Sequence, residues 1–127
     1  MIEVAAAVII SNGMVFLSSR PADKPPAGWE FPGGKLEKGE SPDAAAIREL
    51  QEELDWQIVC GETLYTLHRE NLTIHFISST PLPGSRPVSR EGQEFKWVKI
   101  TPDPPPGLLA NDVEFWKILA AQQDFTS

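Results

Sequence analysis

The chain has 127 residues and a formal net charge of −7, with 41% hydrophobic and 23% charged residues. At roughly 100–200 residues per domain, this length predicts a single domain over residues 1–127. The composition excludes a disordered tail, and no apolar run approaches the roughly 20 residues of a membrane-spanning helix. With 18 acids against 11 bases, a nucleic-acid polymer is not expected as a partner, because binding phosphates concentrates Lys and Arg. No membrane is expected either.

Cysteine content and the N-terminus favour a reducing compartment. Cys60 is the single cysteine, which excludes a disulfide framework and a cysteine-based zinc site. Residues 1–10 are apolar but carry Glu3 where a signal peptide would have basic residues. We therefore expect a cytoplasmic protein, as either a monomer or a homodimer.

Apolar segments separated by turn signals predict the strands. Residues 2–10 and 14–18 form an expected hairpin around the turn at residues 11–13. Pro32-Gly33-Gly34 is a strong breaker after a loop over residues 21–28. The expected strands are residues 2–10, 14–18, 29–31, 57–66, 72–79 and 95–100, with a polar turn at 68–71.

Two helices complete the predicted fold. Ser41 and Pro42 form a favourable helix start, and the following residues up to Leu54 are good helix formers. A second helix is expected over residues 111–122. The order of strands and helices predicts an α+β fold, an α/β/α sandwich with a mixed β-sheet flanked by helices.

The first helix has an unusual distribution of charge. Its apolar stripe is predicted to be buried and comprises Ile47, Leu50 and Leu54. Glu49, Glu52 and Glu53 share the other side, where like charges at this spacing cost about 0.2–0.5 kcal/mol per pair. A bound divalent cation would remove this repulsion, since hard cations prefer carboxylate oxygens. On the residues alone, a cation site and a solvated helix face both remain possible.

Residues 34–56 resemble the Nudix box, the pattern Gly-x5-Glu-x7-Arg-Glu-apolar-x-Glu-Glu-x-Gly-apolar. Asp55 departs from it, in place of the glycine that ends the helix. Asp also tolerates the left-handed conformation, so we expect a less favourable turn and no loss of activity. Residues 29–35 (WEFPGGK) are similar to MutT-type nucleotide pyrophosphohydrolases. So are the segments around Arg20, at residues 91–93 with Trp97 after them, and at residues 110–111.

The resemblance implies an enzyme with the Nudix fold that requires Mg²⁺ or Mn²⁺. The implied reaction is hydrolysis of nucleoside triphosphates to monophosphate and pyrophosphate, with oxidised purine nucleotides such as 8-oxo-dGTP as the expected substrates. Alternatives are a CTP pyrophosphohydrolase, an ADP-ribose-type dinucleotide pyrophosphatase, and a non-enzymatic nucleotide-binding domain. The presence of Glu52 and Glu53 argues against the last alternative.

Carried over by position, the resemblance also implies roles for individual residues. The Gly33 carbonyl and the carboxylates of Glu49, Glu52 and Glu53 would bind the metal. Arg48 would orient these carboxylates, and Glu40 would lie around the metal ligands without binding the metal itself. The implied nucleotide contacts are Arg20, Trp29, Phe31, Lys35 and Asn111.

Some of these roles remain open on the sequence alone. Trp29 and Phe31 could instead belong to the core, and Asn111 could instead cap the last helix. Lys96 occupies the position of a glutamate in MutT-like enzymes, so Glu91 or Glu94 is expected to replace it.

Overall fold

Two four-stranded sheets form the framework of the structure, a computed structural model that describes residues 1–20, 23 and 27–123. The first sheet has the order β5-β1-β7-β6, in which β1 pairs antiparallel with β5 and parallel with β7. In the second sheet, β2, β4 and β8 all pair with β3. The strands are β1 Ile2–Val8, β2 Ile10–Ser11, β3 Met14–Ser19, β4 Trp29–Glu30, β5 Gly33–Lys35, β6 Ile58–Arg69, β7 Leu72–Pro81 and β8 Phe95–Lys99.

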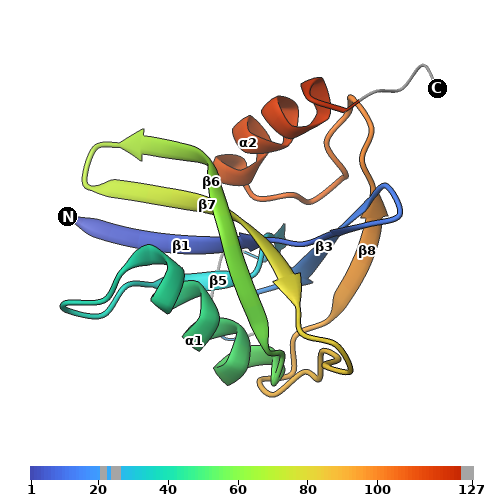
Figure 1. Cartoon of the computed structure of the whole chain (residues 1–127). Helices are drawn as coiled ribbons and strands as arrows, with labels where there is room; N and C mark the ends of the chain where they lie inside the picture. The colour runs from blue at the N-terminus through green and yellow to red at the C-terminus, as the bar shows by residue number, and fades with distance from the viewer. Residues whose placement is uncertain (21–22, 24–26, 124–127) are drawn as a thin grey trace.

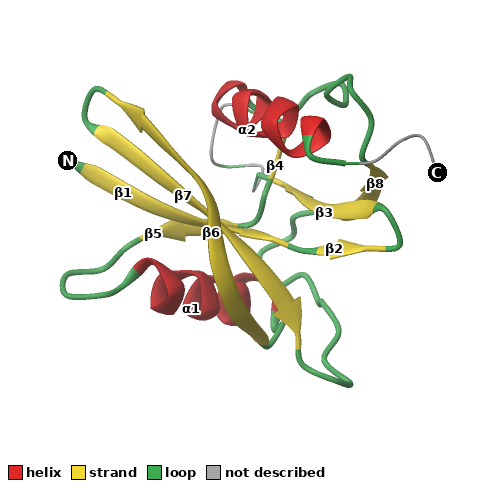
Figure 2. Ribbon diagram, turned by 45° about the horizontal axis from the view of Figure 1, so that its top comes forward, coloured by secondary structure: helices red, strands yellow, loops and turns green. Residues whose placement is uncertain are grey.

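The two helices, α1 (Pro42–Leu54) and α2 (Ala110–Ala121), lie on opposite sides of the first sheet (Figures 1 and 2). The Ser41 hydroxyl accepts a hydrogen bond from the Ala44 N–H at 3.1 Å, as expected of an N-cap. Asp55 ends α1 in the left-handed conformation, with φ 49° and ψ 36°. The predicted mixed sheet flanked by helices is confirmed, as is the capping role of Asp55.

A separate apolar core fills each side of the first sheet. Toward α2, the rings of Phe76 and Phe115 stack with centroids 4.3 Å apart, and Trp116 is fully buried. Toward α1, the fully buried Leu50 and Leu54 pack with residues of β1 and β3. Only the second half of β1, residues 5–8, is buried, and there the strand consists of small and β-branched apolar residues that do not alternate with polar ones.

The prediction that Ile47 is buried is wrong, since its side chain is 41% exposed. Ala45 and Ala46 instead face the sheet, beside Ala5 on β1. These three alanines and Ile77 form one fully buried cluster between the helix and the sheet, where small side chains allow close packing.

Several boundaries also differ from the prediction, and β5 lies at residues 33–35, where the sequence predicted a breaker. The strand expected over residues 2–10 ends at Val8, because the chain passes from the first sheet to the second at Ile9. β6 continues to Arg69 instead of ending at residue 66, which leaves a two-residue turn in which Asn71 has φ 65°. Most of the loop predicted over residues 21–28 lies outside the described residues.

Substitutions on α1 test which residues hold it against the sheet. Leu50→Ala should lower the free energy of unfolding by about 2–5 kcal/mol, because it leaves a cavity in a fully buried position. Ile47→Ala, one turn earlier and exposed, should change it by about 0.5 kcal/mol or less. Urea unfolding of both variants measures the difference. Equal losses would contradict the observed orientation of the helix.

Candidate active site

A pocket of about 520 Å³ opens beside the first sheet and draws residues from both sheets and both helices. One part is apolar, one part is rich in carboxylates, and backbone without side chains lies between them. The lining residues are Val4, Ala6, Ser19, Arg20, Glu30, Phe31, Gly33, Gly34, Lys35, Glu49, Glu53, Leu72, Ile74, Leu109, Asn111 and Asp112.

The apolar part of the pocket comes from β1 and β7, where Val4 lies opposite Ile74 in the register. Leu72 belongs to the same face of β7, because it is two residues from Ile74. Sequence reasoning missed these residues. Alternation along the two strands identifies a common face, but it does not show that this part of the face borders a pocket.

Glu49 and Glu53, one turn apart on α1, line the opposite part of the pocket. Burial raises the pKa of the Glu53 carboxyl well above its usual range, and a hydrogen bond with Glu49 and the charges of Glu49, Glu91 and Glu30 raise it further. Ionisation of this crowded carboxyl is therefore disfavoured unless positive charge is brought to it.

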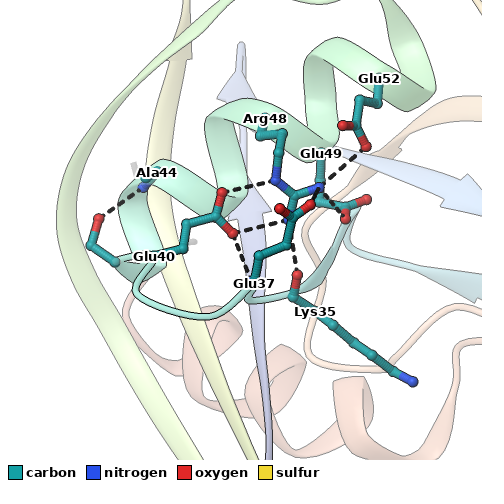
Figure 3. Close-up of polar contacts among 8 residues, drawn as sticks. Lys35, Glu37, Glu40, Ala44, Arg48, Glu49 and Glu52 are labelled. Carbon is teal, nitrogen blue, oxygen red and sulfur yellow. Dashed lines mark hydrogen bonds and ion pairs between the residues drawn. The ribbon is translucent and has the colours of Figure 1, made fainter.

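Arg48 connects the acidic residues on the outer side of the pocket (Figure 3). Its guanidinium donates to both carboxylate oxygens of Glu40, at 2.8 and 3.0 Å, and to Glu49 at 2.9 Å. Through the Arg48 hydrogen bonds first, and then a bond from the Glu37 N–H, the pKa of Glu40 falls to about 2. Arg48 therefore fixes one oxygen of Glu49 while that residue lines the pocket.

Glu52, the third glutamate of the predicted metal-binding set, lies apart from the other two. Its side chain is 57% exposed and accepts a hydrogen bond from Arg48 at 3.2 Å. It does not line the pocket. Within the described ranges, no three His, Cys, Asp or Glu side chains are grouped so as to hold a metal ion.

Gly33 and Gly34 allow two close approaches at the pocket, of β5 to β1 at Gly33 and of the Glu49 side chain to β5 at Gly34. A Cβ on Gly34 would lie 2.4 Å from the Glu49 carboxyl carbon, and one on Gly33 would lie 1.9 Å from the Ala5 carbonyl oxygen. Only glycine fits at position 33, whereas a side chain at position 34 would displace the Glu49 carboxylate. The site thus combines carboxylates with peptide carbonyls free of side chains, the hard oxygen donors that suit a Mg²⁺ ion.

At the start of α2, Asp112 is buried in the pocket wall and its carboxylate accepts a hydrogen bond from the Phe31 N–H at 3.0 Å. Burial raises the pKa of this carboxyl to about 7, although the Phe31 hydrogen bond opposes the shift. Asp112 was missed in the sequence, where it looks like an ordinary acid in the first turn of a helix.

Asn111 lines the pocket beside Asp112 and is not the N-cap of α2. The cap position is Leu109, and no side chain caps this helix. The alternative that Asn111 caps the last helix is therefore wrong. Its amide is free of that role.

The other residues predicted to contact the nucleotide lie in different surroundings in the structure. Arg20 and Lys35 line the pocket, where an Arg20 nitrogen lies 3.4 Å from Glu30. Phe31 is 3% exposed and packs in the core against Phe76 and Phe115, although it also borders the pocket.

Trp29 does not line the pocket. It lies half-buried against the core on the α2 side, with the Lys96 ammonium 3.9 Å from the centre of its ring. Its backbone pairs with the chain just before α2, through hydrogen bonds to Gly107 and Leu109.

Comparison with known proteins identifies the class of fold. The NUDIX domain family model matches residues 1–115, so the chain belongs to the Nudix family. The chain is 34% identical to the 8-oxo-dGTP diphosphatase of Escherichia coli over 87% of its own length and 86% of that protein. It is 48% identical to the E. coli CTP pyrophosphohydrolase, over 55% of its own length and 53% of the relative, about half of each.

Solved structures support the same assignment. The MutT structure from Aliivibrio salmonicida and Vibrio cholerae superposes with a TM-score of 0.75 at 35% identity, covering 96% of this chain and 98% of that one. The predicted Nudix resemblance and fold are confirmed. Nudix hydrolases generally need divalent metal ions and act on small-molecule nucleotides. Among the described residues, no helix is long and apolar enough to cross a membrane.

The buried Asp112 should give the protein a distinctive pH dependence of stability. A carboxyl whose pKa rises on folding binds a proton that the unfolded chain has already released, so stability falls as the pH rises from about 4 to about 7. In Asp112→Asn this fall should be smaller by more than about 1 kcal/mol, because one pKa unit corresponds to about 1.4 kcal/mol. The Asn side chain can still accept the Phe31 hydrogen bond.

Denaturant unfolding at pH 4.5, 6 and 7.5 measures this difference. The exposed Asp103→Asn is the matched control and should retain the wild-type profile. If the free energy of unfolding depends on pH in the same way in wild type and in Asp112→Asn, the folded protein does not hold a proton on the Asp112 carboxyl.

Proposed function

We propose that this chain hydrolyses nucleoside triphosphates to monophosphate and pyrophosphate, with oxidised purine nucleotides such as 8-oxo-dGTP as substrates. The observation that carries the proposal is the division of one pocket into two parts. An apolar wall with Asn111 and Asp112 suits a base, and the carboxylates of Glu49 and Glu53 suit metal-bound phosphates. A nucleoside triphosphate has this same division between base and phosphates.

The base would lie against the apolar wall formed by Leu72 and Ile74, with Asn111 and Asp112 at its polar edge. An amide presents a donor and an acceptor side by side. With a pKa of about 7, Asp112 can present either a carboxylate or a protonated carboxyl. Two adjacent polar groups of this kind can distinguish bases by their pattern of donors and acceptors.

Arg20 and Lys35 would contact the phosphates from their places on the pocket lining. Positive charge is needed there, because an acidic pocket repels a polyphosphate.

The metal would be Mg²⁺ or Mn²⁺, held by the Gly33 carbonyl and the carboxylates of Glu49 and Glu53. Glu52, whose exposed carboxylate contacts Arg48 here, would complete the set. A bound cation offsets phosphate charge and activates water for attack on phosphorus. Arg48 would hold Glu49 in a fixed orientation throughout, through the contacts shown in Figure 3.

The relatives support this reading and provide one alternative. The full-length similarity to an 8-oxo-dGTP diphosphatase favours the oxidised purine. CTP is the second candidate, since the higher identity to a CTP pyrophosphohydrolase covers 55% of the chain. In either case, we propose a cytoplasmic enzyme acting on small-molecule nucleotides, where such substrates are found.

Pyrophosphate release from a panel of nucleotides with Mg²⁺ tests the proposal. The panel should contain 8-oxo-dGTP, dGTP and CTP, each measured at several concentrations so that kcat/KM values can be compared. ADP-ribose is tested beside them by the formation of AMP, because its hydrolysis releases no pyrophosphate. The highest value is expected for 8-oxo-dGTP. A preference for CTP would support the alternative, and no pyrophosphate from any triphosphate would contradict the proposed reaction.

Removing the charge of Glu53 should abolish activity without unfolding the protein. Glu53→Gln is expected to lower kcat by on the order of a hundredfold or more, because a metal-binding carboxylate is lost. Its melting temperature without metal should stay close to that of wild type at pH 7, because the raised pKa keeps the Glu53 carboxyl protonated there and glutamine is neutral as well. The exposed Glu62→Gln on β6 is the control. Full wild-type turnover in excess EDTA would contradict the metal assignment.

Asn111→Asp should change base selection with little effect on stability. The structure assigns no capping role to Asn111, so the melting temperature should remain close to that of wild type. Replacing the amide donor by an acceptor should change the kcat/KM ratio between 8-oxo-dGTP and dGTP by about 1–3 kcal/mol, or roughly five- to 150-fold. Unchanged ratios across the nucleotide panel would show that Asn111 does not contact the base.

A further inference from the structure

Glu114, near the start of α2, joins this helix to the hairpin formed by β6 and β7. One of its carboxylate oxygens accepts a hydrogen bond from the Tyr65 hydroxyl at 2.5 Å, and the other accepts one from the Arg69 guanidinium at 2.7 Å. Within the described residues, the hydrogen bonds that join α2 to β6 both end on this carboxylate. Figure 1 shows the start of α2 beside these strands. We call the three residues the Glu114 network.

The charges within the Glu114 network fit one another. The hydrogen bonds from Tyr65 and then from Arg69 hold the pKa of the Glu114 carboxyl below its usual range. The bond to Glu114, followed by burial, raises the pKa of the Tyr65 hydroxyl. At neutral pH an ionised carboxylate therefore receives two donors, which is the stronger class of hydrogen bond. The Tyr65 ring lies against Phe76 and Phe115, so its hydroxyl is presented from the packed core.

The end of the hairpin that carries Arg69 also carries the apolar wall of the pocket. Arg69 on β6 pairs directly with Leu72 on β7. Leu72 and Ile74 line the pocket, and Leu72 also pairs with Ile2 on β1, so its backbone is held between two neighbouring strands. The apolar wall is therefore fixed within the sheet, and contacts with the hairpin determine how far from it α2 lies.

The residues of α2 that line the pocket lie within one turn of Glu114. Asn111 comes three residues before it and Asp112 two residues before it. At 3.6 residues per turn, Asn111 and Glu114 are about 60° apart around the helix axis, so a shift of one moves the other. This helix start has no side-chain cap, and Asp112 ties it to Phe31 on the side away from the hairpin. Glu114 provides the connection on the hairpin side.

We propose that Glu114 is a positioning residue, which sets the distance between the apolar wall and the start of α2 and thereby how tightly and how selectively the pocket holds a base. The inference rests on the proposed function, in which the base lies between Leu72 and Asn111. Glu114 does not itself line the pocket, so it acts through the position of α2. The Arg69 and Glu114 side chains are 45% and 39% exposed, and ion pairs this exposed contribute little to overall stability. The effect is therefore expected in substrate binding and not in the melting temperature.

Glu114→Gln and Tyr65→Phe are the main variants, because each keeps the size of the side chain and removes one part of the Glu114 network. The KM for the preferred nucleotide of the panel should rise about five- to tenfold, since contacts to the base are misplaced. The kcat should stay within about twofold of wild type, because the proposed metal site on α1 is untouched. The preference in kcat/KM over the next nucleotide should fall by at least about threefold. The melting temperature should stay close to that of wild type.

Two comparisons separate this positioning from a general loosening of the protein. Arg69→Gln should raise KM by itself but have little further effect in a Glu114→Gln background, because the carboxylate that Arg69 binds is already replaced. Glu3→Gln is the matched control, since Glu3 contacts His75 at 3.2 Å in another exposed pair. Glu3 follows the opposite face of β1 from its pocket-lining neighbour Val4, so KM should stay within about twofold. An undiminished effect of Arg69→Gln in the Glu114→Gln background, an equal rise of KM in Glu3→Gln, or a loss confined to kcat would overturn the inference.

Failure of the proposed function can be recognised separately, because the wild-type chain would then hydrolyse no nucleoside triphosphate. Hydrogen exchange still tests the positioning in that case. The Asp112 and Val113 amides, which both donate to the Leu109 carbonyl, should exchange faster in Glu114→Gln, whereas the Gln122 amide at the other end of α2 should not. Unchanged exchange at the first two amides, or unchanged KM and base preference in both main variants, would overturn the inference.

Discussion

The close packing of α1 against the first sheet determines where the acidic groups of this protein lie. Ala5, Ala45 and Ala46 are fully buried between the two backbones, and Gly34 lies directly beneath the Glu49 carboxyl. A larger side chain at any of the three alanines would push the helix away from the sheet, and one at Gly34 would displace the Glu49 carboxyl. The carboxylates would then move away from the pocket, so the site depends on a layer of the smallest residues.

This packing brings like charges together, and the surrounding structure compensates for only part of their repulsion. Arg48 binds Glu40, Glu49 and Glu52 on the outer side of α1, where it offsets their charges. Glu53 lies on the inner side and does not contact Arg48, which is why burial and its acidic neighbours dominate its titration. A cation beside Glu53 would stabilise its ionised carboxylate. The ion that the proposed chemistry needs would therefore also relieve the repulsion among these acidic residues.

The opposite end of the pocket depends on a second contact between distant segments. The Asp112 carboxylate on α2 accepts a hydrogen bond from the Phe31 backbone, just before the glycines that border the proposed metal-binding residues. The base-contacting and phosphate-contacting parts of the proposed site are therefore joined through residues 31–34. A rigid connection of this kind suits a reaction in which positioning contributes more than covalent chemistry.

The local sequence determined most of the elements and the identity of the acidic face. The Ser41 cap, the Asp55 terminus and the spacing of Glu49, Glu52 and Glu53 depend on near neighbours, which is why they could be predicted. Tertiary structure alone decided which of these glutamates face the pocket, that Ile47 is exposed, that Asp112 is buried and that Arg69 meets Glu114. Each of these outcomes depends on contacts between residues remote in sequence, and burial and pKa follow from such contacts and not from the periodicity of one segment.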